Sequence, residues 1–374
     1  MRTRNSLKLG IGFLLASVVT ARADVNVVTS IKPVHSLVAT VMKGVGEPGI
    51  IIQGGGSPHT FAMKPSQAAM LEKANVVFWI GPQIESFLSK PLKAIAAKAK
   101  VVELIDTAGL TKLELREGGA FEAHDDHDDH GHAKGKHDDH DKEKKAAHGE
   151  KDHHDHHKKK KAGHDDKHDD RHKKKKAGHD DKHDDHHKKE AGGHGHGHEH
   201  GEFDAHIWLD PVNGQVLVKH IAKVLSKADP ANKSKYEANA AAAVEQLKAV
   251  QTEITAELKS FGGKGFIVFH DAYQNFEKRF GLTATGSITV SPEVVPGAKR
   301  VRELRAKIKE TGVACVFAEP QFEPKLVSTV IEGTSAKSGV LDPLGAGIEN
   351  GPGLYVKLIR NMAASFKSCF AKAG

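Results

Sequence analysis

The chain has 374 residues, of which 28% are charged, with a formal net charge of +7, 27 histidines and only two cysteines. No apolar run reaches the roughly 18 residues that a membrane-spanning helix needs, which excludes an integral membrane protein. The positive excess is modest and spread along the chain, which argues against a nucleic-acid-binding surface. The length is too great for one small module and fits two lobes of ordinary size.

Residues 1–23 have the pattern of a secretory signal peptide. Three basic residues up to Lys8 precede an apolar stretch over 9–19, and small residues follow at Ala21 and Ala23. We expect cleavage after Ala23 and a mature protein in an oxidising compartment, the periplasm. Neither cysteine stands directly after the signal, where a lipid anchor would need one, so we expect the mature protein to be soluble.

A histidine-rich segment, residues 122–202, interrupts the chain. It holds 22 of the 27 histidines, and its only hydrophobic residues are seven alanines. Such a segment cannot bury enough apolar surface to offset the entropy lost on ordering, so we expect it to be disordered. A 15-residue stretch that begins at His164 is nearly repeated from His179. A polar repeat of this kind indicates repeat expansion rather than a folded solenoid.

Short β-branched runs alternate with segments of helical spacing on both sides of this insertion. The expected strands cover residues 25–29, 49–53, 76–80, 101–104, 265–270, 283–288, 313–318 and 339–341. An alternating order of strands and helices predicts parallel sheets flanked by helices. The expected fold class is therefore α/β, with two similar lobes.

Residues 231–261 contain neither glycine nor proline, and apolar residues recur there at spacings of three and four. Pro230 is a start signal and Gly262 a stop signal, so we expect one helix of about 31 residues and about 45 Å. It would connect the lobes rigidly and allow little lobe movement, unless it folds onto one lobe only. The expected organisation is a signal peptide (1–23), an N-terminal lobe (24–230) with the insertion (122–202), the connecting helix (231–263) and a C-terminal lobe (264–374).

Five histidines lie outside the insertion. His59 follows a glycine-rich turn, His270 ends an expected strand, and His206 stands where the chain leaves the insertion. Open α/β sheets bind ligands at the carboxyl ends of their strands, and three neutral imidazoles suit a borderline-soft ion such as zinc. The alternative is that each is an ordinary surface or hydrogen-bonded loop histidine. His35 and His220 fall inside helical patterns and are assigned no role.

Cys315 and Cys369 are the two cysteines of the chain. In an oxidising compartment they favour one disulfide, which would tie the last helix to a strand. The bridge would close a loop of about 55 residues, and the loss of chain entropy predicts roughly 4 kcal/mol of stabilisation. The alternative is a pair of buried, inert thiols.

Five motifs carry a resemblance to a known family. They are SPHTFAMKP (57–65), DAHIWLDP (204–211), FHDAY (269–273), FAEPQF (317–322) and LDPLG (341–345). Together with the long helix, the histidine-rich insertion and the cysteine pair, they resemble the zinc-binding ABC-transporter solute-binding proteins of the ZnuA type, within the cluster A-I metal-binding family. The resemblance covers nearly the whole mature chain in the same order.

The resemblance implies that His59, His206 and His270 are zinc ligands in a cleft between the lobes. It implies a periplasmic protein that captures Zn²⁺ as cargo with high affinity and delivers it to an inner-membrane ABC permease with its ATPase, without enzymatic activity. We further expect a monomer without a nucleic-acid partner.

Two other functions are alternatives. One is a manganese or iron carrier of the same fold, but manganese-binding relatives carry a carboxylate where this chain has His270, and imidazole favours zinc. The other is a zinc hydrolase, because three histidines and an open position could also activate water. No HExxH pair, nucleophile elbow or phosphate loop supports that reading.

For the fourth ligand and for Glu319, the sequence leaves two alternatives each. Some family members have a glutamate before the first histidine, where this chain has Pro58. Asp342 matches the position of an aspartate ligand in the manganese-binding relatives, so either Asp342 or a water would complete a tetrahedron. Glu319 would either accept a hydrogen bond from a ligand imidazole and fix its tautomer, or cap nearby backbone groups.

The insertion ends just before His206 and is expected to emerge near the mouth of the cleft. Motifs such as HDDH (124–127) and HGHGH (194–198) can place two imidazoles on one ion in many arrangements. We expect additional Zn²⁺ ions to bind there weakly, so that the insertion collects or senses zinc and raises its local concentration. The alternative is an expendable insertion with incidental metal affinity.

Overall fold

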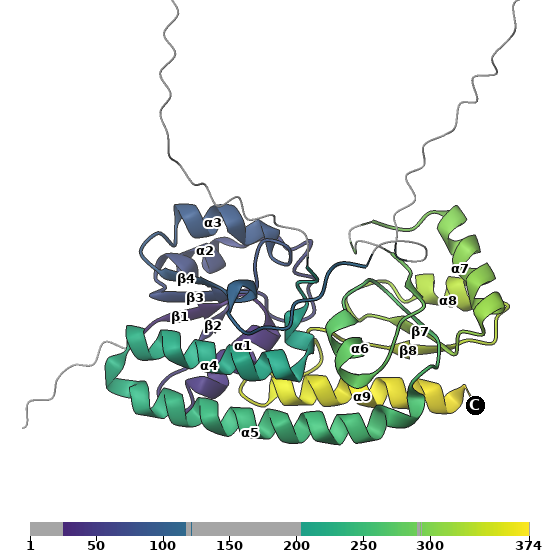
Figure 1. The fold of residues 1–374 in the computed structure, drawn as a ribbon. Coiled ribbons are helices and arrows are strands. Elements are labelled where there is room, and N and C mark those ends of the chain that lie inside the picture. Colours follow the sequence, from purple (N-terminus) through teal and green to yellow (C-terminus); the bar gives the residue numbers. More distant parts are fainter. Residues whose placement is uncertain (1–24, 117–120, 122–202, 290–291, 293, 374) are drawn as a thin grey trace, which may run out of the picture. The chain divides into compact units, whose positions relative to one another are not determined.

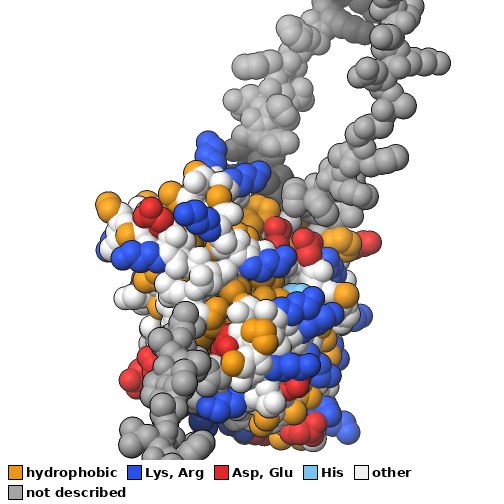
Figure 2. Space-filling model, turned by 90° about the vertical axis from the view of Figure 1, so that its left-hand side faces the viewer, with side chains coloured by type: hydrophobic (Ala, Val, Ile, Leu, Met, Phe, Trp, Pro, Cys, Tyr) orange, Lys and Arg blue, Asp and Glu red, His pale blue; other side chains and the backbone are white. Residues whose placement is uncertain are grey.

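A computed structural model describes residues 25–116, 121, 203–289, 292 and 294–373. The expected signal peptide and the histidine-rich insertion lie outside these residues. The described residues form two sheets, each flanked by helices (Figure 1). None of the described helices combines the length and apolarity that crossing a membrane requires. On the face that Figure 2 shows, lysine and arginine side chains are dispersed among hydrophobic and uncharged groups.

The first sheet consists of parallel strands in the order β2-β1-β3-β4. Its strands are β1 (Val27–Thr29), β2 (Gly49–Ile50), β3 (Val76–Trp79) and β4 (Lys100–Glu103). Every residue of the central strands β1 and β3 is buried, as expected where helices cover both faces of a parallel sheet. The four strands predicted for this lobe are confirmed, although the structure shortens several of them.

In the part of the chain that the structure describes, four α-helices accompany the first sheet. They are α1 (Lys32–Val41), α2 (Pro65–Glu72), α3 (Ser89–Ala94) and α4 (Pro211–Ala228), with 3₁₀ turns η1 (Ser86–Leu88), η2 (Leu104–Asp106) and η4 (Ile207–Leu209). The start of α4 shows why it begins there: Oδ1 of Asp210 accepts a hydrogen bond from Val212 N at 2.8 Å, and Pro211 occupies the first helical position. Both features are typical of helix starts.

The second sheet repeats this arrangement. Its parallel strands β5 (Phe266–Val268), β6 (Gly286–Ser287), β7 (Cys315–Ala318) and β8 (Lys337–Val340) lie in the order β6-β5-β7-β8. Its helices are α6 (Gln274–Phe280), α7 (Ala298–Thr311), α8 (Lys325–Ile331) and α9 (Leu354–Lys372). Strands β5 to β8 occupy the positions that β1 to β4 occupy in the first sheet. The prediction of two similar α/β lobes is therefore confirmed.

One long helix, α5 (Lys233–Leu258), links the lobes. It is extended by the 3₁₀ turns η5 (Pro230–Asn232) and η6 (Lys259–Phe261), so the helical stretch matches the predicted one closely. Its buried residues, from Tyr236 to Leu258, recur at the predicted spacings of three and four. They pack against α1 and α4 of the first lobe and α9 of the second, so the helix does not fold onto one lobe only (Figure 1).

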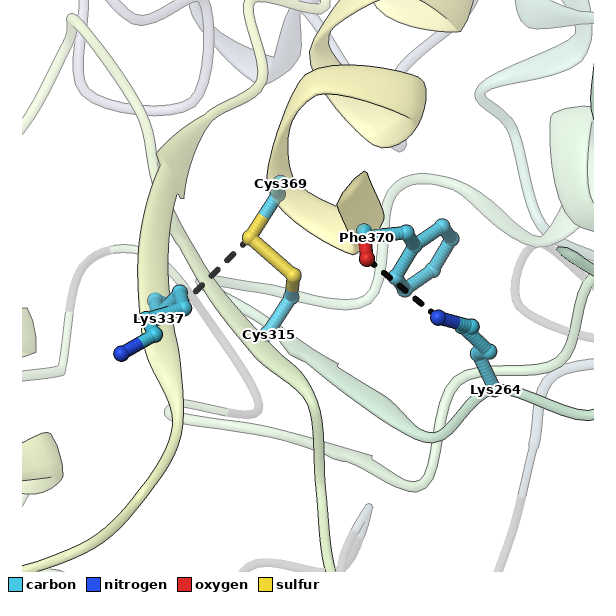
Figure 3. The surroundings of a disulfide bond; sticks show 5 residues. All are labelled: Lys264, Cys315, Lys337, Cys369 and Phe370. Carbon is cyan, nitrogen blue, oxygen red and sulfur yellow. Dashed lines mark hydrogen bonds between the residues drawn. A yellow bond between two sulfur atoms is a disulfide. The ribbon is translucent and has the colours of Figure 1, made fainter. Parts of the chain in front are cut away.

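The predicted disulfide between Cys315 and Cys369 is present and joins β7 to α9 (Figure 3). Its two Cα atoms are 6.2 Å apart. Beside it, Nζ of Lys264 donates a hydrogen bond to the carbonyl of Phe370 at 3.3 Å. The last helix is thereby attached to its sheet by a covalent bond as well as by packing.

The lobes also meet through buried side chains near the strand ends. The indole Nε1 of Trp208, in the first lobe, donates to the carbonyl of Pro343 in the second at 2.8 Å. The ammonium of Lys32, at the start of α1, donates to the carbonyls of Ala346 and Ile348 at 3.1 and 2.7 Å. These contacts hold the carboxyl ends of the two sheets against each other.

Candidate metal centre

Two of the three histidines singled out from the sequence lie in loops that follow strands, and the third lies just before a 3₁₀ turn. His59 lies between β2 and α2, and its backbone N–H donates to Oγ of Ser57 at 3.3 Å. His206 directly precedes η4, and His270 comes two residues after β5. Parallel strands end at a common edge, and ligands of α/β sheets bind outside that edge. The two lobes therefore bring these loops to one place.

The three imidazole rings face one another. Their centroids are separated by 5.7 Å (His59 and His206), 5.8 Å (His59 and His270) and 5.3 Å (His206 and His270). One ring nitrogen from each lies within 4.8 Å of the other two, and no other group of His, Cys, Asp and Glu among the described residues converges in this way. Zinc–nitrogen bonds are about 2.0–2.1 Å long, so these nitrogens can all bind one ion after at most a small inward shift of the rings.

The rings line a cavity that is very small. Its free volume is about 10 Å³, and its other walls include Trp208 and Phe322. A volume of this size holds about one water-sized sphere. The cavity therefore accommodates a single ion and has no room for an organic substrate.

Two of the rings are held by buried carboxylates. Nδ1 of His206 lies 2.8 Å from Oδ1 of Asp204, and Nδ1 of His270 lies 2.7 Å from Oε1 of Glu319. Both carboxylates are almost fully buried, with exposed fractions of 1% and 2%. A carboxylate at Nδ1 keeps the proton on that nitrogen and leaves Nε2 free to bind a metal, as is common for histidine ligands.

The protonation of the rings favours metal binding at His59. Burial, together with the neighbouring His206 and His270, lowers the pKa of His59 to about 3, so this ring is neutral at physiological pH. Burial by itself would lower the pKa of His270, but the adjacent carboxylate of Glu319 outweighs it and raises that pKa. A proton bound at His270 must leave before the ring can bind an ion, and metal binding supplies the free energy for that loss.

The Nε2 atom of His270 has an unmet bonding requirement. It is buried and has no hydrogen-bond partner among the described residues. A buried polar atom without a partner costs free energy. A metal ion between the three rings would satisfy it, so the residues present fit a zinc ion well.

The structure places Asp342 outside the group of converging ligand atoms. Its Oδ1 accepts hydrogen bonds from the backbone N–H groups of Leu344 and Gly345 at 3.1 and 2.9 Å, and its Oδ2 accepts one from Ala346 at 2.6 Å. The Asp342 carboxylate therefore shapes the turn after β8.

The two histidines without an assigned role also lie apart from the centre. Nε2 of His35, in α1, is 3.1 Å from the carbonyl of Pro48. His220 lies within α4, near Lys223 and Lys100, and burial followed by these two charges lowers its pKa. Neither side chain belongs to the converging group.

Sequence reasoning missed the supporting roles of Asp204 and Asn275. Asp204 stands two residues before His206, a spacing at which a carboxylate can fold back onto the ring, and this signal is present in the sequence. Nδ2 of Asn275, in α6, donates to Oδ2 of Asp204 at 2.8 Å. The position of Asn275 in the sequence carries no signal for that contact.

Two lobes with parallel sheets of matching strand order, one long linking helix and a three-histidine centre define a metal-binding solute-binding protein. The family model described as "zinc-uptake complex component A, periplasmic" matches residues 27–369. The chain belongs to this family, which consists of solute-binding proteins and not of enzymes.

Individual relatives agree with this assignment. The chain is 48% identical to the high-affinity zinc uptake system protein ZnuA of Brucella suis biovar 1 over 374 residues, which is the full length of both chains. A solved structure described as a crystal structure of ZnuA superposes with a TM-score of 0.65 at 21% identity, covering 93% of this chain and 99% of that one. A zinc-bound deletion mutant of ZnuA superposes with a TM-score of 0.61 at 21% identity, covering 93% and 98%. The two structures establish the likeness of the fold.

Proposed function

We propose that this protein captures one Zn²⁺ ion at His59, His206 and His270 and delivers it to an inner-membrane ABC permease with its ATPase. The observation that carries the proposal is the convergence of three ring nitrogens within 4.8 Å. Membership of a periplasmic zinc-uptake family supports both the cargo and the compartment.

The donor set favours zinc over manganese. Imidazole nitrogens suit zinc, whereas manganese prefers harder oxygen donors. With Asp342 bound to three backbone N–H groups, we assign the fourth position of the tetrahedron to a water molecule. A water in the fourth position is readily displaced, so it also gives an entering ligand a place to attack when the ion is released.

Capture requires no chemical step. The neutral ring of His59 and the rings oriented by Asp204 and Glu319 replace the hydration shell of the entering ion, and the small cavity excludes other solutes. Release requires that the ligands separate. Since His59 and His206 belong to the first lobe and His270 to the second, a small relative displacement of the lobes on docking would remove one ligand from the other two.

The histidine-rich insertion, residues 122–202, has a separate role in this proposal. It binds additional Zn²⁺ ions weakly and passes them to the three-histidine site. The mature protein is a monomer that has lost residues 1–23 by cleavage after Ala23. Its histidine content supports this role.

A zinc titration of the mature protein lacking residues 124–200, in competition with a calibrated chelator, tests the tight site. We expect one tight equivalent, lost in the variant His59→Ala, His206→Ala, His270→Ala. The control is His220→Ala, which removes a histidine of α4 and should leave binding unchanged. Tight binding that survives in the triple variant would place the site elsewhere and refute the proposal.

A further inference from the structure

Helix α6 of the second lobe contacts the two first-lobe segments that flank the insertion, residues 111–116 and 203–210. Four of its residues make polar contacts with these segments. The pairs are Gln274 Nε2 with the carbonyl of Glu114 (3.0 Å), Asn275 Nδ2 with Oδ2 of Asp204 (2.8 Å), Oε2 of Glu277 with Nη1 of Arg116 (2.8 Å) and Nη2 of Arg279 with Oδ2 of Asp210 (2.7 Å). One short helix therefore joins the second lobe to the described segments on both sides of the insertion.

Among these contacts, the one at Asp204 reaches the metal centre directly. Oδ1 of Asp204 accepts hydrogen bonds from the backbone N–H of His206 at 3.0 Å and from its ring Nδ1 at 2.8 Å. Oδ2 accepts from Asn275, which is 2% exposed. A side chain of the second lobe thus holds the carboxylate that orients a ligand of the first lobe.

The chain His206–Asp204–Asn275 makes the orientation of His206 depend on the packing of the lobes. When α6 lies against Asp204, both carboxylate oxygens have donors and the ring of His206 has one favoured orientation. When α6 moves away, Oδ2 loses the N–H group of Asn275 that donates to it. The carboxylate of Asp204 then rotates toward another hydrogen-bond donor. Groups that orient a metal ligand typically change metal affinity by about 10- to 100-fold when they are removed.

We propose that Asn275 is a positioning residue for His206, and that its bond to Asp204 couples retention of zinc to the docking of α6 on the first lobe. Zinc is held while the lobes are packed, and a displacement of α6 accelerates its release by freeing Asp204 and then His206. This inference rests on the three-histidine site proposed above, and its test is designed to fail separately from that proposal.

The test measures how fast zinc leaves the full mature chain when it is mixed with excess chelator. Trp208 provides a local signal, because its ring centroid is 5.2 Å from that of His206 and the insertion contains no tryptophan. We expect Asn275→Leu, which keeps the number and branching of the side-chain heavy atoms, and Asn275→Ala to release zinc about 10-fold faster, the lower end of the range for groups that orient ligands. Two variants are measured so that, if one of them folds poorly, the other still tests the proposal.

The matched control is Asn232→Ala, at the start of α5. Nδ2 of Asn232 also donates to an aspartate, Oδ2 of Asp229 at 2.5 Å, but neither residue lines the metal cavity. We expect it to lower the melting temperature without changing zinc release. In zinc-free protein, ring ¹⁵N shifts of His206 should show one tautomer in the wild type and in Asn232→Ala, and a mixture in the Asn275 variants.

Three results would overturn the inference. The first is that both Asn275 variants release zinc at a rate within twofold of the wild type. The second is that Asn232→Ala accelerates zinc release as much as the Asn275 variants do. The third is further acceleration by Asn275→Leu in an Asp204→Ala background, since a residue that acts through Asp204 has no effect once Asp204 is gone. The variant His59→Ala, His206→Ala, His270→Ala tests the site itself, independently of Asn275. If the fluorescence of Trp208 still reports tight zinc binding in that variant, the three-histidine site is refuted.

Discussion

Nδ1 of His270 lies 2.7 Å from Oε1 of Glu319, and both side chains are almost fully buried. The same relationship holds in the other lobe, where Nδ1 of His206 lies 2.8 Å from Oδ1 of Asp204. Each lobe therefore presents one imidazole whose tautomer is set by a buried carboxylate. The ring of His59 completes the centre.

Replacing Glu319 by glutamine should weaken zinc binding by about 10- to 100-fold, because a neutral amide oxygen is a weaker acceptor than a carboxylate for the N–H at Nδ1 of His270. Competition with a calibrated chelator measures this loss. Glu323→Gln, an exposed glutamate on the loop after β7, is the control and should bind like the wild type. Unchanged affinity in Glu319→Gln would mean that the carboxylate only caps the strand end.

Arg116→Met should lower the free energy of unfolding by about 3 kcal/mol, because it leaves the carboxylates of Asp271 and Glu277 without their shared cation. Burial raises the pKa of Glu277 even with Arg116 present, so the loss should be larger at pH 8 than at pH 5. Urea unfolding at both pH values checks this.

The control for Arg116 is Arg360→Met, which removes an exposed ion pair with Glu253. Surface pairs contribute less than about 1 kcal/mol. If both variants lost the same free energy of unfolding, Arg116 would contribute no more than an exposed ion pair, which would contradict the prediction.

Glu85 should make the stability of the zinc-free protein fall as the pH rises. Burial raises the pKa of Glu85 from 4.5 to about 7, although Ser30, Gly81 and Ile80 donate hydrogen bonds to its carboxylate. Between these values the native state binds the proton more tightly than the unfolded chain, so stability is lost on going from pH 4.5 to 7. The loss is on the order of 3 kcal/mol.

Glu85→Gln should remove this pH-dependent contribution. Urea unfolding curves at pH 5 and pH 7.5 should then differ less in the variant than in the wild type. Glu237→Gln, an exposed glutamate of α5, should keep the wild-type difference. A variant at Glu85 with an unchanged pH dependence would assign that dependence to other groups.

Replacing both Cys315 and Cys369 by serine should reduce the free energy of unfolding by about 2–5 kcal/mol, because the unfolded chain regains the entropy that the bridge removes. Denaturant unfolding of the zinc-free protein measures this. Zinc affinity should change little, since the bridge joins β7 to α9 and neither cysteine lines the metal cavity. A reducing agent should lower the stability of the wild type equally and leave the serine variant unaffected.

Deleting residues 124–200 should reduce the total number of zinc ions bound while one tight equivalent remains. The reason is that all three proposed ligands lie outside the deleted segment. Equilibrium dialysis gives the stoichiometry, and the fluorescence of Trp208 reports the tight site. If tight binding disappears together with the insertion, the two sites are not independent.

Local spacing was sufficient to predict much of the fold. Buried β-branched runs indicated β1, β3, β5 and β7, because central parallel strands are apolar on both faces. The predicted runs at residues 49–53 and 283–288 extended beyond β2 and β6, since these short edge strands pair over only two residues. The long helix was visible because its buried stripe recurs every three to four residues without interruption.

The sequence by itself determined the two α/β lobes, the linking helix, the cysteine pair and the placement of His59, His206 and His270 at loops and strand ends. All of these follow from residue type and short-range spacing, which act within one element. Only the tertiary structure decided that the three rings converge, that the carboxylate of Asp342 is taken up by backbone N–H groups, and that Asn275 supports Asp204 from 71 residues away. Contacts of this kind depend on how two separately folded sheets pack against each other, and no local pattern encodes that packing.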